Sequence, residues 1–191
     1  MNNTIFTAET APEKSRPLLE GVKNKMGMVP NILGGMAVAP ATLQAYIGLS
    51  GAFAQTSLSP AEQQVVALSI SHVNGCDYCM AAHTTMAKGA GVAQEVVDAV
   101  RNGTALEPKL EALRTFALRM QESKGHLEAG ELDAFLGAGY SEAQAYEVIV
   151  GIALKVITNY SNRLLNTPVD AAFAANAWKK PSCETACGCS A

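Results

Sequence analysis

The fold is decided by one stretch of the chain, residues 58–84, which reads LSPAEQQVVALSISHVNGCDYCMAAHT. It opens with Ser59, Pro60 and Glu62 at the positions that start a helix: a hydroxyl at the N-cap, a proline in the first turn and an acid three residues after the cap. An Asn-Gly pair in the middle ends this helix, and a second helix-forming run follows it directly. The stretch therefore predicts two consecutive helices joined by a tight turn.

The rest of the chain carries the same helical signals. Alanine, which has the highest helix propensity, occurs 32 times in 191 residues. Apolar side chains recur at helical spacing in three stripes, which we expect to pack in the core: Val66, Ile70 and Val73; Leu110, Leu113, Phe116 and Met120; and Val148, Ile152 and Val156. Similar helix starts recur at 141–144 and 167–170, and helices are expected near residues 12–26, 39–55, 60–73, 76–88, 92–101, 108–123, 128–136, 142–158 and 168–178. Because the connections are short, the sequence predicts an all-α bundle of antiparallel neighbours.

Composition and charge exclude several classes of protein. The 14 basic and 17 acidic residues give a net charge of −3, which provides no basic surface for a nucleic acid. The N-terminus has no basic start followed by an apolar run, so no secretory signal is predicted. The most apolar internal run, residues 148–154, is far too short to cross a bilayer. We therefore expect a soluble, cytoplasmic protein with no nucleic-acid or membrane partner, built as one helical domain (1–178) and a flexible tail (179–191).

Three reactive side chains share one face of the second helix: Cys76, Cys79 and His83. Asn74 or Gly75 is expected to cap this helix, which would place Cys76 in its first turn. Cysteines three residues apart in a helix have Cα atoms about 5 Å apart, within the range of about 4.4–6.8 Å that a disulfide needs. A helix N-terminus favours a thiolate, and an imidazole one turn beyond Cys79 is within reach for proton exchange.

The cysteine pair leaves three interpretations open. A redox-active dithiol fits the spacing and the nearby histidine best, and a metal site or a pair of inert buried thiols are the alternatives. A structural zinc site needs four ligands, and this segment supplies three. The fourth would have to come from His72, a tail cysteine or another subunit, so we assign no metal. His72 itself either faces the thiols or has a structural role.

The chain resembles the alkylhydroperoxidase D (AhpD) and carboxymuconolactone decarboxylase family, and most of all its peroxidase-related members. The resemblance rests on residues 58–68 followed by 74–84, both part of the stretch quoted above. Residues 27–31, GMVPN, are similar to the entry segment of that family, and two short stretches within residues 159–174 are similar to its end. The resemblance covers about residues 5–178 and leaves the cysteine-rich tail outside.

This resemblance implies an AhpD-like helical bundle that is oligomeric and reduces hydroperoxides with thiols. In that scheme Cys79 attacks the peroxide and becomes a sulfenic acid, Cys76 resolves it to a disulfide, and His83 relays protons. No organic cofactor is implied. The implied partners are a hydroperoxide, an external thiol reductant and further copies of the chain. Carboxymuconolactone decarboxylases proper lack the cysteine pair, so the pair favours the peroxidase side.

Two positions depart from the pattern of the family. Its relay glutamate stands twelve residues before the first cysteine, where this chain has Gln64, which cannot accept a proton at neutral pH but can orient water. Glu62, two positions away, is expected to serve the capping box. Arg163, directly after Asn162, stands where many peroxidase-related members have histidine. Tyr78, between the two cysteines, is expected either to contact the substrate or to pack.

The tail adds three more thiols, Cys183, Cys187 and Cys189, for which three roles stay open. They could carry reducing equivalents to the Cys76–Cys79 pair, bind a thiol-seeking metal or metalloid, or have no specific role. The favoured function is therefore a thiol-dependent peroxidase. A metal-binding or redox-sensing protein that uses the pair and the tail is the first alternative, and an enzyme like the lactone decarboxylases is the second.

Overall fold

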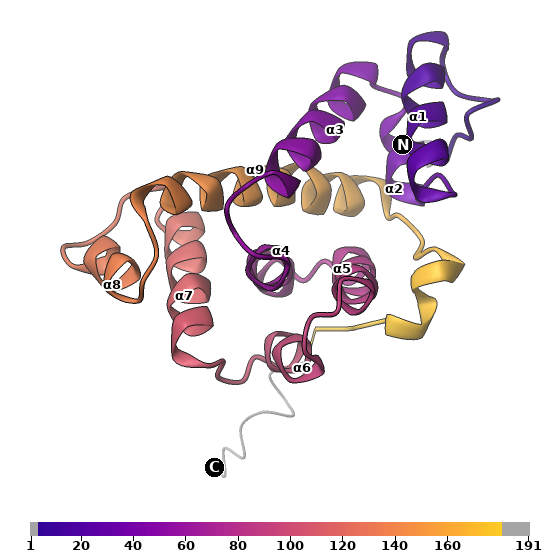
Figure 1. Ribbon diagram of the computed structural model, residues 1–191. Coiled ribbons are helices and arrows are strands. Elements are labelled where there is room, and N and C mark those ends of the chain that lie inside the picture. The colour runs from indigo at the N-terminus through magenta and orange to yellow at the C-terminus, as the bar shows by residue number, and fades with distance from the viewer. Residues whose placement is uncertain (1–3, 181–191) are drawn as a thin grey trace, which may run out of the picture.

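The structure is a computed structural model that describes residues 4–180, and every regular element within them is helical (Figure 1). The α-helices are α1 (Arg16–Met26), α2 (Asn31–Met36), α3 (Pro40–Ala54), α4 (Pro60–Val73), α5 (Asp77–Gly89), α6 (Gln94–Asn102), α7 (Pro108–Glu122), α8 (Glu131–Gly137) and α9 (Glu142–Leu165). Two short 3-10 helices are η1 (Glu13–Ser15) and η2 (Ala171–Asn176). The expected all-α fold is confirmed.

Helix α4 lies at the centre of the arrangement. It packs against α5, α6, α7 and α9, and Figure 1 shows it end-on in the middle of the molecule. The 24-residue helix α9 runs across one side, with α3 packed against it. Helices α1 and α2 lie near one end of α9, and α7 and α8 lie near the other (Figure 1). The α4–α5 turn, which carries the cysteine motif, is thereby enclosed by its neighbours.

The helix starts and apolar stripes follow the sequence closely. Ser59 and Ser141 form capping boxes with Glu62 and Gln144, as predicted. Most stripe residues lie in a core cluster formed mainly by α4, α6, α7, α8 and α9. Val73 and Val156 are the exceptions: Val73 is the last residue of α4 and 41% of its surface is exposed, and Val156 is only partly buried. A second cluster, formed mainly by α1, α2, α3 and α5, contains both cysteines of the motif.

Helix α2 was not predicted, because its sequence contains two adjacent glycines and glycine disfavours a helix interior. Close packing explains both glycines. A Cβ atom on Gly34 would lie 2.5 Å from the carbonyl oxygen of Phe6, and one on Gly35 would lie 2.6 Å from Cδ1 of Leu165. Tertiary contact therefore stabilises a helix that local propensity opposes.

The C-terminal third differs from expectation in two places. Helix α9 continues to Leu165, seven residues beyond the expected end at residue 158. The helix expected over 168–178 is the short 3-10 helix η2, whose side-chain cap is absent because Asp170 bonds elsewhere. Its carboxylate accepts the Tyr78 hydroxyl and the backbone N–H of Asn31 instead.

No helix among residues 4–180 combines the length and the apolar character that crossing a membrane requires.

Candidate active site

The α4–α5 turn sets the position of both cysteines. Gly75 has φ +60°, a left-handed conformation that glycine adopts without steric cost, and it reverses the chain at the end of α4. Cys76 itself is the N-cap of α5, not a first-turn residue, which corrects the expected cap at Asn74 or Gly75. Its carbonyl accepts the N–H of Met80 at 2.9 Å. Cys79 is therefore the third residue of the helix, near its positive end.

The two thiols lie together and are held by one amide. They are 3.4 Å apart and unbridged, and their residues are only 7% (Cys76) and 3% (Cys79) exposed. Asn162, from α9, donates its Nδ2 to the sulfur of Cys79 at 3.3 Å and to that of Cys76 at 3.6 Å. The Sγ atoms are thus close enough to join with little movement of the backbone.

A polar chain of three side chains from three helices lies beside Cys79. Gln64 of α4 accepts the Nδ1–H of His83 through Oε1 at 2.9 Å. This bond fixes the tautomer of the ring and leaves the lone pair of Nε2 free to accept. Nε2 of His83 contacts Nζ of Lys155, a residue of α9 that is 2% exposed. The relay position that lacks a carboxylate is therefore joined, through the imidazole, to a buried cation.

The surroundings shift the pKa values of the two thiols in opposite directions. The hydrogen bond from Cys76, followed by the charge of Lys155, lowers the pKa of the Cys79 thiol although burial opposes this. The same bond and burial raise the pKa of Cys76. Loss of water and the neighbouring Lys155 charge lower the pKa of His83 well below its usual value. These shifts favour ionisation of Cys79 before Cys76 and the neutral form of the imidazole.

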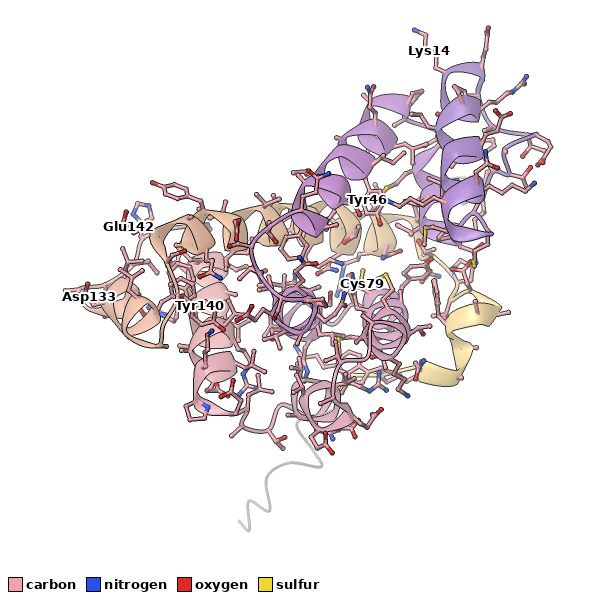
Figure 2. All side chains as sticks on the ribbon, viewed as in Figure 1. Lys14, Tyr46, Cys79, Asp133, Tyr140 and Glu142 are labelled. Atoms are coloured by element: carbon pink, nitrogen blue, oxygen red, sulfur yellow. The ribbon has the colours of Figure 1, made fainter. Side chains whose placement is uncertain are left out.

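Two cavities reach the cysteine pair, one at Cys79 and the other at Cys76. A small cavity of about 50 Å³ reaches Cys79, and His83, Lys155 and Tyr46 line it together with apolar side chains from α1, α2 and η2. Figure 2 shows Cys79 and Tyr46, which project from α5 and α3. A larger cavity of about 390 Å³ reaches Cys76 and is lined by polar side chains of α9 and the segment after it. Asn162 and Tyr78 line both cavities, so the dithiol lies between them.

A family model matches the part of the chain that carries the buried dithiol and the histidine. The model, described as the Carboxymuconolactone decarboxylase family, covers residues 40–123, which span α3 to α7. This match, over 84 of the 191 residues, supports an AhpD-like member of the family. No curated protein matches the sequence.

Solved structures show that the chain has the AhpD-like fold. The AhpD-core, peroxidase-related protein from Ralstonia eutropha JMP134 superposes with a TM-score of 0.78 at 20% identity, covering 88% of this chain and 92% of that one. A peroxidase-related protein from Silicibacter sp. TM1040 gives 0.75 at 18%, covering 91% and 95%. The debrominase Bmp8, in complex with 2,3,4-tribromopyrrole, gives 0.76 at 24%, covering 92% and 95%.

Tyr78 holds three segments together. Its hydroxyl donates to Asp170 at 2.5 Å and accepts the backbone N–H of Ile32 at 3.4 Å. The Asp170 carboxylate also accepts the N–H of Asn31, the first residue of α2. Burial and then the Asp170 carboxylate raise the pKa of Tyr78. Its hydroxyl is therefore a structural link between α5, α2 and the C-terminal segment, while its ring lines the site.

The structure places His72 outside this group of side chains. Its Nδ1 bonds to the carbonyl of Val100 at 2.8 Å, and its ring lies 5.2 Å from that of Trp178. Glu62 is also engaged elsewhere, in the capping box and with Lys109. Neither residue lines the cavity that reaches Cys79. Both side chains serve to join helices.

Sequence reasoning missed Lys155, Asn162 and Asp170. The signal for the first two was present, because Val148, Lys155, Asn159 and Asn162 occupy one phase of α9 and are all buried. Polar residues that continue an apolar stripe mark a functional face. This face was missed because the helix was predicted to end at residue 158, before Asn159 and Asn162. Asp170 carries no such local signal, since its partners are distant in sequence.

The three tail thiols, for which three roles were left open, lie beyond the described part of the chain. Cys183, Cys187 and Cys189 fall within residues 181–191, outside the structure. Among residues 4–180 no three His, Cys, Asp or Glu side chains are grouped to hold a metal ion.

Proposed function

We propose that the chain is a thiol-dependent peroxidase in which Cys79 attacks a hydroperoxide and Cys76 resolves the product. The observation that carries this proposal is the asymmetry of the pair: Cys79 lies within 3.4 Å of Cys76, and its surroundings lower the pKa of Cys79 while they raise that of Cys76. Such asymmetry separates an attacking thiol from a resolving one. The AhpD-like fold supports the proposal at the level of architecture.

The reaction divides between two steps. The Cys79 thiolate attacks one peroxide oxygen, so that an S–O bond forms and the O–O bond breaks, and the leaving alkoxide takes a proton from Lys155. Cys76 then attacks the Cys79 sulfenic acid, a disulfide forms, and hydroxide departs with the Cys76 proton as water. An external thiol later returns two electrons to the disulfide.

The three-residue chain beside Cys79 supports the first step. Gln64 cannot move a proton, but it orients His83 so that Nε2 accepts from Lys155. Lys155 then offers its remaining protons and its charge to the cavity that Cys79 faces. A buried cation therefore takes the place of the relay carboxylate that the family pattern led us to expect.

The cavity at Cys79 favours a small substrate. Its volume of about 50 Å³ holds a few water-sized groups, whereas pockets for larger organic ligands measure roughly 300–1,000 Å³. Hydrogen peroxide or a short alkyl hydroperoxide fits this space. We therefore expect turnover to fall as the alkyl group grows.

Peroxide consumption tests the proposal. Wild type with a thiol reductant is expected to consume hydrogen peroxide, and Cys79→Ser and Cys76→Ser are each expected to lose at least about a hundredfold of the rate, because each breaks one step. Ser69→Ala, at a buried hydroxyl on α4 that lines neither cavity at the thiols, is the control and keeps its rate. Unchanged turnover in the Cys79→Ser variant contradicts the proposal.

The same assays separate the alternative functions. Stoichiometric bound metal without loss of two thiols on peroxide addition would favour a metal or redox sensor. Lactone decarboxylation that survives replacement of both cysteines by serine would favour the decarboxylase. Debromination of 2,3,4-tribromopyrrole without peroxide consumption would favour chemistry like that named for Bmp8.

A further inference from the structure

The two cavities give the two cysteines separate access. The cavity at Cys79 is small and partly apolar, whereas the one at Cys76 measures about 390 Å³ and lies within the size range of ligand pockets. The proposed peroxide substrate needs only the cavity at Cys79, where the attacking thiol lies. The second is far larger than the proposed substrate requires, so it has room for another reactant that meets Cys76.

The lining of this larger cavity calls for a polar, hydrogen-bonding occupant. Asn162, which is 6% exposed, has no partner for Oδ1 within residues 4–180, and the same holds for the buried Oγ1 of Thr167. Both residues line the cavity. Unpaired buried acceptors are costly, and backbone N–H groups of an entering peptide would satisfy them. Arg163 and Asp77 also line the cavity; Arg163 donates to the carbonyl oxygen of Asn74 at 3.0 Å and forms no ion pair within residues 4–180.

The last described residue lies beside this cavity. Lys180 donates its Nζ to the carbonyl of Val73 at 2.9 Å, and its Cδ would lie 3.4 Å from a Cβ on Gly75. Gly75 lines the cavity and immediately precedes Cys76. Cys183 follows three residues after Lys180, a stretch of chain that spans at most about 10 Å. Glu184, next in sequence, has the charge that Arg163 would pair with.

The chemistry of thiol–disulfide exchange also favours attack at the sulfur of Cys76. A thiolate that attacks a disulfide expels the other sulfur, and the thiol of lower pKa leaves faster. Here Cys79 has the lowered pKa and Cys76 the raised one. Attack at Cys76 from the larger cavity therefore releases the better leaving group.

We propose that the tail cysteines, residues 183–189, enter the larger cavity and reduce the Cys76–Cys79 disulfide by attacking Sγ of Cys76. This inference rests on the proposed function, because the peroxidase reaction is what forms the Cys76–Cys79 disulfide. The Cys183 thiolate forms a bond to Cys76, and Cys79 leaves as a thiolate. Cys187 then attacks Cys183, forming a tail disulfide and freeing Cys76, which takes a proton. Two electrons pass from the tail dithiol to the pair, and an external thiol reduces the tail.

A trapping experiment tests this contact without any peroxide. The variant Cys79→Ser/Cys187→Ser/Cys189→Ser keeps two thiols, Cys76 and Cys183, and its matched control Cys76→Ser/Cys187→Ser/Cys189→Ser keeps Cys79 and Cys183. Each is oxidised with one equivalent of diamide and mapped by mass spectrometry of non-reduced peptides. We expect an intramolecular Cys76–Cys183 disulfide whose rate does not change on dilution, at least about tenfold faster than any link in the control.

Other outcomes overturn the inference. Equal linking in both variants removes the preference for Cys76, and a rate that falls on dilution assigns the contact to a second copy. If Cys76 forms an adduct with added glutathione but no link to Cys183, a free small thiol occupies the cavity instead of the tail.

A kinetic measurement separates this inference from the peroxidase proposal. In Cys183→Ser/Cys187→Ser/Cys189→Ser, a single peroxide turnover should still produce the Cys76–Cys79 disulfide, while its reduction by limiting dithiothreitol should slow by about tenfold or more. Unchanged reduction contradicts the tail's role. Failure of the peroxide step in both this variant and wild type contradicts the peroxidase proposal alone, because the trapping result does not depend on it.

Discussion

At the scale of single residues, the chemistry depends on where one buried cation lies. Lys155 is almost fully buried and contacts His83 on one side, while its charge lowers the pKa of Cys79. Asn162 holds both sulfurs from the same helix face. None of these polar atoms is at the surface, so the thiolate is stabilised by fixed groups that need no reorganisation of solvent.

Replacing Lys155 by methionine should raise the pKa of Cys79, because the thiolate loses the nearby positive charge. The rate of alkylation by iodoacetamide follows the thiolate fraction, so its pH profile should move to higher pH, and alkylation at pH 7 should slow by about tenfold or more. Lys88→Met, at an exposed lysine near the end of α5, is the control. An unchanged profile for Lys155→Met contradicts the assigned role.

Replacing His83 by asparagine should remove part of the acid sensitivity of folding. The folded state lowers the pKa of His83 below 6.5, so below that pH the unfolded chain binds more protons and stability falls. One such proton contributes up to about 1.4 kcal/mol per pH unit. Urea unfolding at pH 7 and pH 5 should show a smaller decrease for the variant, with His72 retained in both proteins. Equal decreases would place the titrating group elsewhere.

At the scale of elements, close approach of α9 to α3 and α4 positions the site. A Cβ on Gly151 of α9 would lie 2.8 Å from Cε2 of Phe53 and 2.9 Å from Cγ1 of Val66. Lys155 lies one turn beyond Gly151 on the same helix and meets His83 across this contact. The glycine therefore lets α9 approach the α4–α5 turn closely enough for Lys155 and Asn162 to reach the thiols.

Gly151→Ala should destabilise the fold by about 1–3 kcal/mol, because the core has no room for the methyl group. Gly48→Ala, in the interior of α3 with nothing within 4 Å of its Cβ position, should instead stabilise it by up to about 1 kcal/mol. Free energies of unfolding from urea titration measure both changes. A gain in stability for Gly151→Ala would show that α9 does not pack as described.

The elements also show which parts of the fold the sequence could predict. The starts at Ser59 and Ser141 were predictable because capping is local, and the cysteine motif was predictable because its spacing fits one helix face. Helix α2 was not, since its glycines are explained only by contacts with Phe6 and Leu165. The contacts of Gln64 and Lys155 with His83 join three helices, and no local pattern states which helices will meet.

At the scale of the whole molecule, one face of α9 is left without a partner within the described chain. It exposes Tyr146, Ile149, Tyr160 and Leu164, and the exposed fractions of Tyr146, Tyr160 and Leu164 are 74%, 65% and 62%. These positions follow the 3-4 spacing of a single helix stripe. Apolar side chains grouped on one face mark an interaction surface. The homo-oligomer that the family resemblance implies is therefore proposed to form through this face.

Sedimentation velocity tests this assembly. Wild type is expected to sediment as an oligomer, and Tyr160→Glu/Leu164→Glu is expected to sediment as a smaller species, because the added charges would be buried without partners. Glu142→Gln, at an exposed position at the start of α9, is the control and leaves the oligomer unchanged. A monomeric wild type at micromolar concentration contradicts the proposal.

The most direct measurement of the central claim is a single-turnover thiol map. The tail variant Cys183→Ser/Cys187→Ser/Cys189→Ser contains only Cys76 and Cys79, and it receives one equivalent of hydrogen peroxide before rapid alkylation and peptide mass spectrometry. We expect the peroxide to be consumed and both thiols to be lost together, as one disulfide between Cys76 and Cys79. Peroxide left intact with two free thiols, or oxidation at Cys76 with Cys79 still reduced, would contradict it.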